Sequence, residues 1–208
     1  MRQSSSPLLN PVIIAVAGLL FVGAGLVGGP DFVIDVAAIH SLANDRVAKA
    51  GLTNGAVMLT QLGSVEGLMA ILILTVALLA SARRWRDAVS LVAIVVSGRI
   101  AIELLKLAVD RPRPSFTPHP VEVHSLSFPS GHAGNSMLTF LAIALIAAPA
   151  RWRGRAVALA IVSSLAIGAT RPYLGVHWPS DVVGGWAFGI AWVIALVALS
   201  RRWRGAAE

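Results

Sequence analysis

The chain has 208 residues, of which 56% are hydrophobic and 13% charged, and its formal net charge is +7. Soluble domains carry about 25% charged residues, so this composition indicates a membrane protein. The absence of cysteine excludes disulfides, thiolate metal sites and thiol nucleophiles. Because the basic residues form short clusters between apolar runs, the charge does not indicate nucleic acid as a partner.

Six segments are apolar enough to cross a hydrocarbon core of about 30 Å, which takes roughly 20 helical residues. They lie near residues 11 to 29, 55 to 81, 88 to 108, 132 to 150, 156 to 170 and 181 to 200. The first could be a cleaved signal peptide, but its apolar run exceeds the roughly 7 to 15 residues usual for one, so a retained anchor is favoured. We expect an all-α bundle of six transmembrane helices, with residues 1–208 forming a single domain.

Arginine clusters predict the orientation of these segments. They follow the second, fourth and sixth segments, at Arg83, Arg84 and Arg86, at Arg151, Arg153 and Arg155, and at Arg201, Arg202 and Arg204. The positive-inside rule places such clusters, and with them both termini, in the cytoplasm. The connections at residues 30–54, 109–131 and 171–180 are then predicted to lie outside.

These outer connections carry an unusual set of side chains. Four of the five histidines lie there, and His132 begins the fourth segment; the four are His40, His119, His124 and His177. Arg111, Arg113 and Arg171 also lie there, although the positive-inside rule disfavours that side. Isolated arginines can simply reach the interface with a long side chain, but three beside clustered histidines indicate a function.

Three motifs occur in order on the predicted outer side. They are Lys106 followed after six residues by Arg113-Pro114; Pro129-Ser130-Gly131-His132; and Arg171, five residues, His177, three residues, Asp181. Over residues 55–200 the chain therefore resembles the type 2 phosphatidic acid phosphatase (PAP2) family, membrane lipid phosphatases that share a site with certain soluble acid phosphatases and vanadium haloperoxidases. It departs from the family at Thr170, where serine is usual.

The basic residues of these motifs suit a phosphoryl group. Its transfer is catalysed mostly by positioning and by stabilising negative charge on its oxygens. Arg113 and Arg171 offer planar forks of donors and Lys106 a compact charge, so together they can cover three oxygens. The alternative for these three residues is surface salt bridging.

The second motif predicts an anion site at a helix start. Ser130 is a plausible N-cap, its neighbours leave backbone N–H groups free, and Gly131 lets the backbone approach a phosphate closely. His132 is then predicted to act as general acid on the leaving oxygen. A purely capping interpretation explains Ser130 and Gly131 but not His132.

The third motif supplies a candidate nucleophile. Asp181, four residues after His177, can fix the tautomer of the imidazole and leave the other nitrogen free to attack. The family resemblance implies a phosphohistidine intermediate, hydrolysed by water that His132 activates. A zinc site of His132, His177 and Asp181 is the alternative, but the adjacent cations repel a metal, so we expect neither metal nor cofactor.

Other polar residues leave alternatives open. His119, Glu122 and His124 either tune the pocket or are solvated loop residues, and His40 has no partner visible in the sequence. In the third segment Arg99, Glu103 and Lys106 share one helix face, and buried charges in membranes are usually paired. We expect Glu103 or Glu66 to neutralise Arg99; otherwise Arg99 reaches an interface.

The expected function is metal-independent hydrolysis of a lipid phosphate or pyrophosphate at the outer face of a bacterial membrane. The resemblance makes undecaprenyl pyrophosphate, phosphatidylglycerol phosphate and phosphatidic acid the candidate substrates, the first two favoured. The alternatives are a small transporter or lipid flippase, since buried charges also mark transport pathways, and a soluble-type haloperoxidase with bound vanadate. The oligomeric state is left open.

Overall fold

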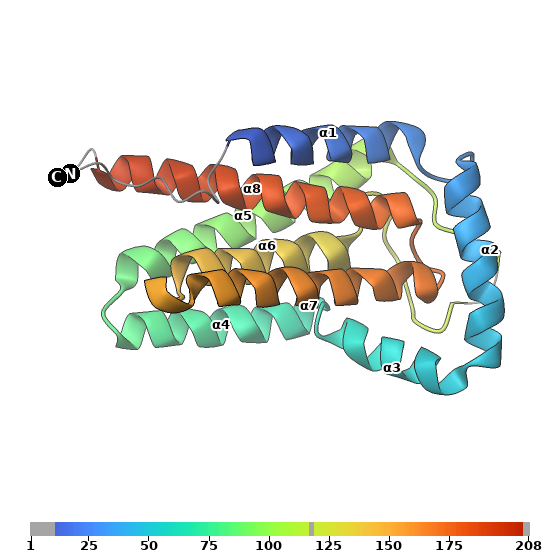
Figure 1. The fold of residues 1–208 in the computed structure, drawn as a ribbon, viewed down its shortest axis with the longest axis horizontal. Helices are drawn as coiled ribbons and strands as arrows, with labels where there is room; N and C mark the ends of the chain where they lie inside the picture. The colour runs from blue at the N-terminus through green and yellow to red at the C-terminus, as the bar shows by residue number, and fades with distance from the viewer. Residues whose placement is uncertain (1–10, 117–118, 206–208) are drawn as a thin grey trace.

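The computed structural model describes residues 11–116 and 119–205, with side chains up to residue 201, and all its regular elements are helices. The predicted all-α class is therefore confirmed, while Arg2 and the side chains of Arg202 and Arg204 lie outside the described residues. The elements in chain order are α1 (Pro11–Val27), α2 (Val33–Ala48), α3 (Ala50–Gln61), α4 (Val65–Ser81), α5 (Trp85–Val109), α6 (Gly131–Ile146), the short 3-10 helix η2 (Ala150–Trp152), α7 (Arg153–Tyr173) and α8 (Pro179–Gly205) (Figure 1).

Helix α6 lies at the centre of the bundle and packs against α5, α7 and α8, while α1 lies along α8. The apolar core surrounds α6, where Leu138 packs with Leu91 and Val193, all fully buried. Helices α6 and α8 approach each other closely at Gly189. A Cβ added there would lie only 2.9 Å from the carbonyl oxygen of Gly134, so a larger residue would not fit. Glycine at this crossing lets the two backbones come into contact.

The predicted second segment, residues 55–81, is not one helix. It is divided between α3 and α4, which are bent by 44°. The hydroxyl of Ser64 accepts a hydrogen bond from the backbone N–H of Gly67 at 3.1 Å, so α4 starts with its own N-cap. The apolar run of the sequence continues across this break, which is why hydropathy alone predicted a single segment.

Three helices are long and apolar enough to cross a membrane: α5, the run from η2 through α7, and α8. If the bent pair of α3 and α4 counts as one crossing, there are up to four. Helices α1 and α6 are apolar but shorter. The protein is an integral membrane protein. The count of six crossings stays a prediction.

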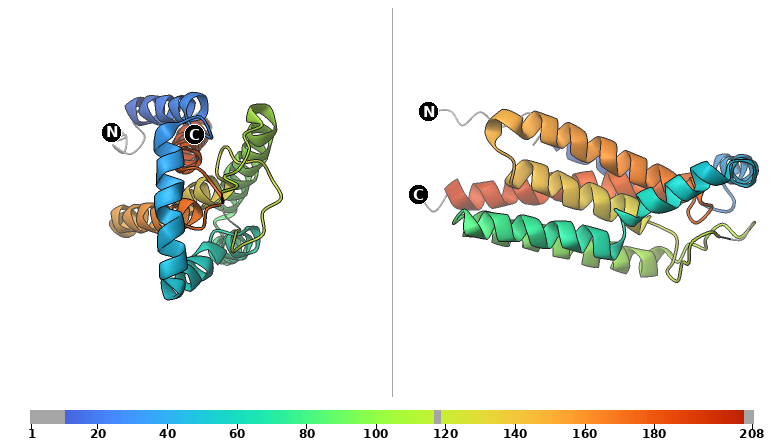
Figure 2. Two further views of the ribbon diagram at one scale, coloured as in Figure 1. Left: turned by 90° about the vertical axis from the view of Figure 1, so that its right-hand side faces the viewer. Right: turned by 90° about the horizontal axis from the view of Figure 1, so that it is seen from below.

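Helix α2 lies across one end of the bundle, as Figure 2 shows, and occupies part of the predicted outer connection at 30–54. Its inner face buries Asp35, Ile39 and Arg46, while Val33 and Val47 are exposed. The guanidinium of Arg46 donates to the carbonyl oxygen of Tyr173 at 2.9 Å. This link ties α2 to the end of α7, at the same end of the bundle as the site described next.

Candidate active site

A cavity of about 230 Å³ lies at the end of the bundle that α2 crosses. It brings together six residues of the three sequence motifs, from four separate parts of the chain. They are Lys106, Arg113, Gly131, His132, Arg171 and His177. The roles predicted for these residues stay predictions, but the structure places them around one space.

Lys106, near the end of α5, is only 6% exposed, and its ammonium lies in the cavity wall. It donates to the hydroxyl of Ser125 at 3.0 Å and forms an ion pair of 3.4 Å with Glu103. A Cβ at Gly131 would lie 3.3 Å from the Lys106 nitrogen. Glycine at the start of α6 therefore keeps space open beside this charge.

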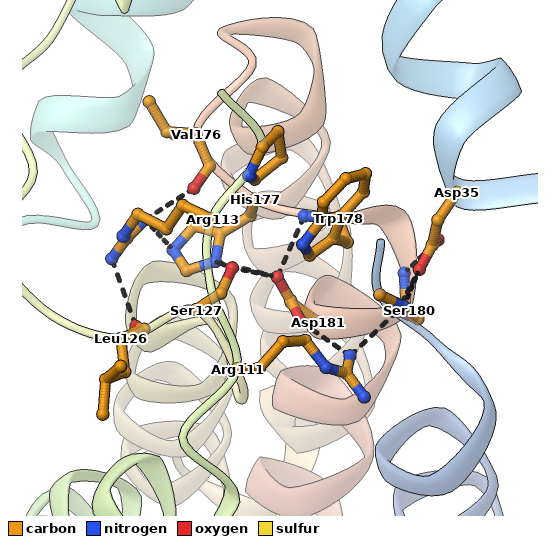
Figure 3. Close-up of polar contacts among 12 residues, drawn as sticks. Asp35, Arg111, Arg113, Leu126, Ser127, Val176, His177, Trp178, Ser180 and Asp181 are labelled. Carbon is orange, nitrogen blue, oxygen red and sulfur yellow. Dashed lines mark hydrogen bonds and ion pairs between the residues drawn. The ribbon is translucent and has the colours of Figure 1, made fainter. Parts of the chain in front are cut away.

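Arg113 lies in the loop between α5 and α6, and carbonyl oxygens hold it against the turn that carries His177. Its Nε donates to the oxygen of Ser125 and its Nη1 to that of Val176, both at 2.6 Å. The same Nη1 lies 3.0 Å from Nε2 of His177 (Figure 3). Nη2 also donates to the hydroxyl of Ser125 and to the carbonyl oxygen of Leu126. Five contacts thus hold in place a charge that the sequence motif only located along the chain.

Arg171, on the last turn of α7, is 3% exposed. Its Nη1 donates to the hydroxyl of Thr60 at 2.8 Å, and its Nε has no hydrogen-bond partner among the described residues. Thr60 lies on the last turn of α3, beside the break between α3 and α4. The bent helix pair therefore provides the hydroxyl that accepts this hydrogen bond from Arg171. A buried, partly unsatisfied guanidinium in the cavity wall suits an anionic ligand.

His177 lies in the turn between α7 and α8, which Gly175 forms with a φ of +75°. A Cβ at Gly175 would clash with the guanidinium of Arg46. Glycine is thus required for both its backbone conformation and the close approach of α2. The turn is the element that presents His177, 2% exposed, to the cavity.

The contacts of His177 define its tautomer. A guanidinium can only donate, so Nε2, which faces Arg113, must carry the lone pair. Nδ1 lies 3.3 Å from Oδ2 of Asp181 and is therefore the protonated nitrogen. Burial lowers the pKa of His177 well below its ordinary value, and the cations Arg113, Arg171 and Lys106 lower it further. The ring is neutral, with its free nitrogen on the cavity side.

Asp181, in the first turn of α8, is fully buried behind His177 rather than in the cavity wall. Oδ2 accepts hydrogen bonds from the hydroxyl of Ser127 and from the backbone N–H of Trp178, the latter at 2.9 Å. Oδ1 forms an ion pair of 2.8 Å with Arg111. A carboxylate held on both oxygens gives the imidazole a fixed orientation.

Arg111, for which the sequence indicated a function without a stated role, lies apart from Lys106, Arg113 and Arg171. It is 5% exposed and points away from the cavity toward Asp181 (Figure 3). It also donates to the carbonyl oxygens of Ala24 and Gly25 at the end of α1, at 2.9 and 2.7 Å. Its charge therefore supports the carboxylate and caps α1.

Asp35 on α2 continues this network and was not identified from the sequence. Its Oδ1 accepts from the backbone N–H of Ser180 at 3.0 Å, and its Oδ2 accepts from the Ser180 hydroxyl and from the N–H of Gly29. The Ser180 hydroxyl in turn accepts from Arg111 at 3.1 Å. A chain of contacts therefore runs from Asp35 through Ser180 and Arg111 to Asp181 (Figure 3).

The second motif begins α6 as expected, with Ser130 at the N-cap position in an extended conformation. Its hydroxyl makes no capping hydrogen bond, and Ser130 does not line the cavity. Its backbone N–H donates to the backbone carbonyl oxygen of Asp181 at 3.0 Å. His132 and Gly131 do line the cavity. Ser130 thus joins α6 to α8, while its neighbours Gly131 and His132 face the cavity.

The remaining candidates are peripheral. Glu122 and His124 line the cavity, and both side chains are highly exposed. Nε2 of His124 lies 3.6 Å from Oε2 of Glu122. His119 contacts the carbonyl oxygen of Pro114 at 2.8 Å, and His40 packs against Phe116 with ring centroids 4.4 Å apart. Among the described residues, no group of three His, Cys, Asp or Glu side chains is arranged to hold a metal ion.

The expected pairing of Arg99 is not found. Glu103 pairs with Lys106 instead, and neither Glu66 nor Glu103 lies within ion-pair distance of Arg99 among the described residues. Arg99 lines the deep part of the cavity. Helix spacing allowed Glu103 to reach either neighbour. In the structure Glu103 pairs with Lys106, three residues away, and not with Arg99, four residues away.

Comparisons with known proteins identify similar chains. The model of the PAP2 superfamily matches residues 87–204. A phosphatidylglycerophosphatase B of Bacillus subtilis is 29% identical over 175 residues, which cover 76% of this chain and 86% of that protein. A lipid A 1-phosphatase of Rhizobium etli is 39% identical over 124 residues, 55% of this chain and 50% of that protein.

A solved structure has the same fold. It is the crystal structure of a transmembrane PAP2-type phosphatidylglycerolphosphate phosphatase from Bacillus subtilis, with a TM-score of 0.82 and 25% identity. The alignment covers 91% of this chain and 96% of that one, so the similarity extends well beyond the residues that the family model matches.

Proposed function

The chain belongs to the PAP2 superfamily and is a lipid phosphatase, and from this premise we propose that it acts through a phosphohistidine at Nε2 of His177. One observation carries the proposal. Nε2 is the unprotonated nitrogen of a ring held by Asp181, and it faces a cavity that three cations line. A nucleophile, its orienting carboxylate and the charges for a phosphate thus share one site.

Attack begins when the phosphate of the lipid enters among Lys106, Arg113 and Arg171. Arg113 transfers its hydrogen bond from Nε2 to a phosphate oxygen, which frees the lone pair. A bond forms between Nε2 and phosphorus as the bond from phosphorus to the leaving oxygen breaks. The electron pair stays on that oxygen. His132, which takes up a proton together with the negatively charged phosphate, passes that proton to the leaving oxygen.

Hydrolysis reverses the role of His132. Now neutral, it takes a proton from water, whose oxygen attacks phosphorus while the bond to Nε2 breaks. Inorganic phosphate leaves and His132 is protonated again. Asp181 stabilises the positive charge that His177 carries while phosphorylated. No metal enters either step, because the three cations supply the charge.

The proposed topology has six crossings, with the cavity outside and the termini in the cytoplasm of a bacterium. Its support is the distribution of arginines: Arg84, Arg153 and Arg201 line a pocket at the end opposite the cavity. The substrate tail then stays in the outer leaflet. Undecaprenyl pyrophosphate and phosphatidylglycerol phosphate are the favoured substrates, ahead of phosphatidic acid.

The experiment is phosphate release from these three lipids by detergent-purified protein in EDTA, with His177→Asn as the control. We expect release by the wild type only. A transporter or flippase has no membrane to act across in detergent and releases no phosphate. Absence of release from all three lipids, or loss of release in EDTA, would refute the proposal.

A further inference from the structure

Arg99 on α5 and Asn135 on α6 are among the polar side chains of the cavity wall that have no part in these steps. Arg99 lies seven residues before Lys106, which is two helical turns or about 10 Å farther from the cavity end of α5. Among the described residues it forms no hydrogen bond or ion pair, and Glu66 attracts it only electrostatically. A charge without a direct partner inside a membrane protein indicates a ligand or a pathway.

Asn135 lies one turn after His132 and is 7% exposed. Its Oδ1 has no hydrogen-bond partner among the described residues, and its Nδ2 would lie 3.7 Å from a Cβ at Gly131. The Lys106 nitrogen would lie 3.3 Å from the same point. The oxygen is an acceptor and does not bind a phosphate, but Nδ2, which lies beside Gly131 near the Lys106 nitrogen, can donate to one.

The direction of the substrate connects these two residues. Its reacting phosphate lies at Nε2 of His177, and its tail must run into the bilayer, toward the middle of α5. A second phosphate between the reacting one and the tail therefore lies on the Arg99 side of Lys106. Glu103 is engaged with Lys106 and is 61% exposed, so it does not occupy Arg99.

We propose that Arg99 and Asn135 form a subsite for a second phosphate on the tail side of the reacting phosphate. This inference rests on the proposed function and names the substrate class: lipids with two phosphates in series, either a pyrophosphate or a phosphoglycerol phosphate. Arg99 supplies the charge and Asn135 an N–H donor. Lipids with one phosphate gain nothing from this subsite.

The test compares substrate pairs that differ in the second phosphate. One pair is farnesyl diphosphate and farnesyl phosphate; the other is phosphatidylglycerol phosphate and phosphatidic acid. Hydrogen bonds to charged groups correspond to about 10- to 100-fold in binding. For each pair we divide kcat/KM for the two-phosphate lipid by kcat/KM for the one-phosphate lipid. We expect Arg99→Gln to lower this ratio about 10- to 100-fold and Arg99→Lys to restore part of the loss.

The matched control is Arg86→Gln, the same change on the same helix about 20 Å from Arg99, which should leave both ratios unchanged. Asn135→Ala should shift the ratios in the same direction by a smaller factor, and it tests the subsite if Arg99→Gln does not fold. The pair whose ratio falls identifies the pyrophosphate or the phosphoglycerol phosphate as the ligand.

Equal loss on both members of each pair, or no loss on any, would overturn the subsite while leaving the phosphatase intact. If the wild type releases phosphate from none of the four lipids, the proposed function fails instead. Calorimetric binding of the same four lipids then still tests the subsite, because tighter binding of the two-phosphate lipids must depend on Arg99.

Discussion

Replacing Arg111 by methionine tests how the buried carboxylate of Asp181 is supported. The change keeps a long side chain but removes the partner of Asp181, whose ion pair is 2.8 Å long with both side chains at most 5% exposed. Solvent screens such a pair little, and breaking one leaves a buried charge that costs about 3 to 5 kcal/mol. The carbonyl oxygens of Ala24 and Gly25 also lose their donor. We expect a fall in the unfolding midpoint on the order of 10 °C.

The assay is thermal unfolding in detergent together with phosphate release. Adding Asp181→Asn should restore part of the stability, because the orphaned charge is gone, but not the activity, because His177 then lacks its orienting carboxylate. Arg151→Met, at an exposed position, is the matched control and should change stability by less than about 0.5 kcal/mol. A stable Arg111→Met protein whose double mutant is no more stable would refute the reasoning.

Further predictions concern the same site. His177→Asn should lower turnover by several powers of ten while the protein stays folded; activity within about tenfold of wild type would exclude His177 as nucleophile. Because the pKa of His177 is lowered, its proton leaves at lower pH and the ring can attack from well below pH 6.5 upward; kcat/KM should therefore show no acid limb from His177 near pH 6.5, and a titration near pH 6.5 assigned to His177 by NMR would contradict this. Asp35→Asn removes an acceptor from Ser180 and should cost about 1.5 to 3 kcal/mol of stability and lower kcat more than it changes KM; unchanged melting and kinetics would show that the network ends at Arg111. Orthovanadate should inhibit competitively, as a five-coordinate mimic of the transferring phosphoryl group, and insensitivity at millimolar vanadate would count against the site.

The sequence determined the class of the protein and the ends of most helices. Runs of apolar residues are a local property, since about 20 of them in succession are enough to favour a membrane helix. The residues of the three motifs are also local in pattern, because Lys106 and Arg113, or His177 and Asp181, are near each other along the chain. The reported similarity to the PAP2 superfamily agrees with those spacings.

Only the tertiary structure decided how His177 and Asp181 are supported. Arg111 and Asp181 are 70 residues apart in the sequence, and Asp35 and Ser180 are 145 residues apart. The spacing of residues along a helix or strand therefore cannot predict that they touch. The break at Ser64 likewise lies inside an apolar run. Mean hydropathy does not register the hydroxyl that caps α4 there. Buried polar groups must find partners wherever the fold brings them, and that choice depends on how α1, α2 and α8 pack together.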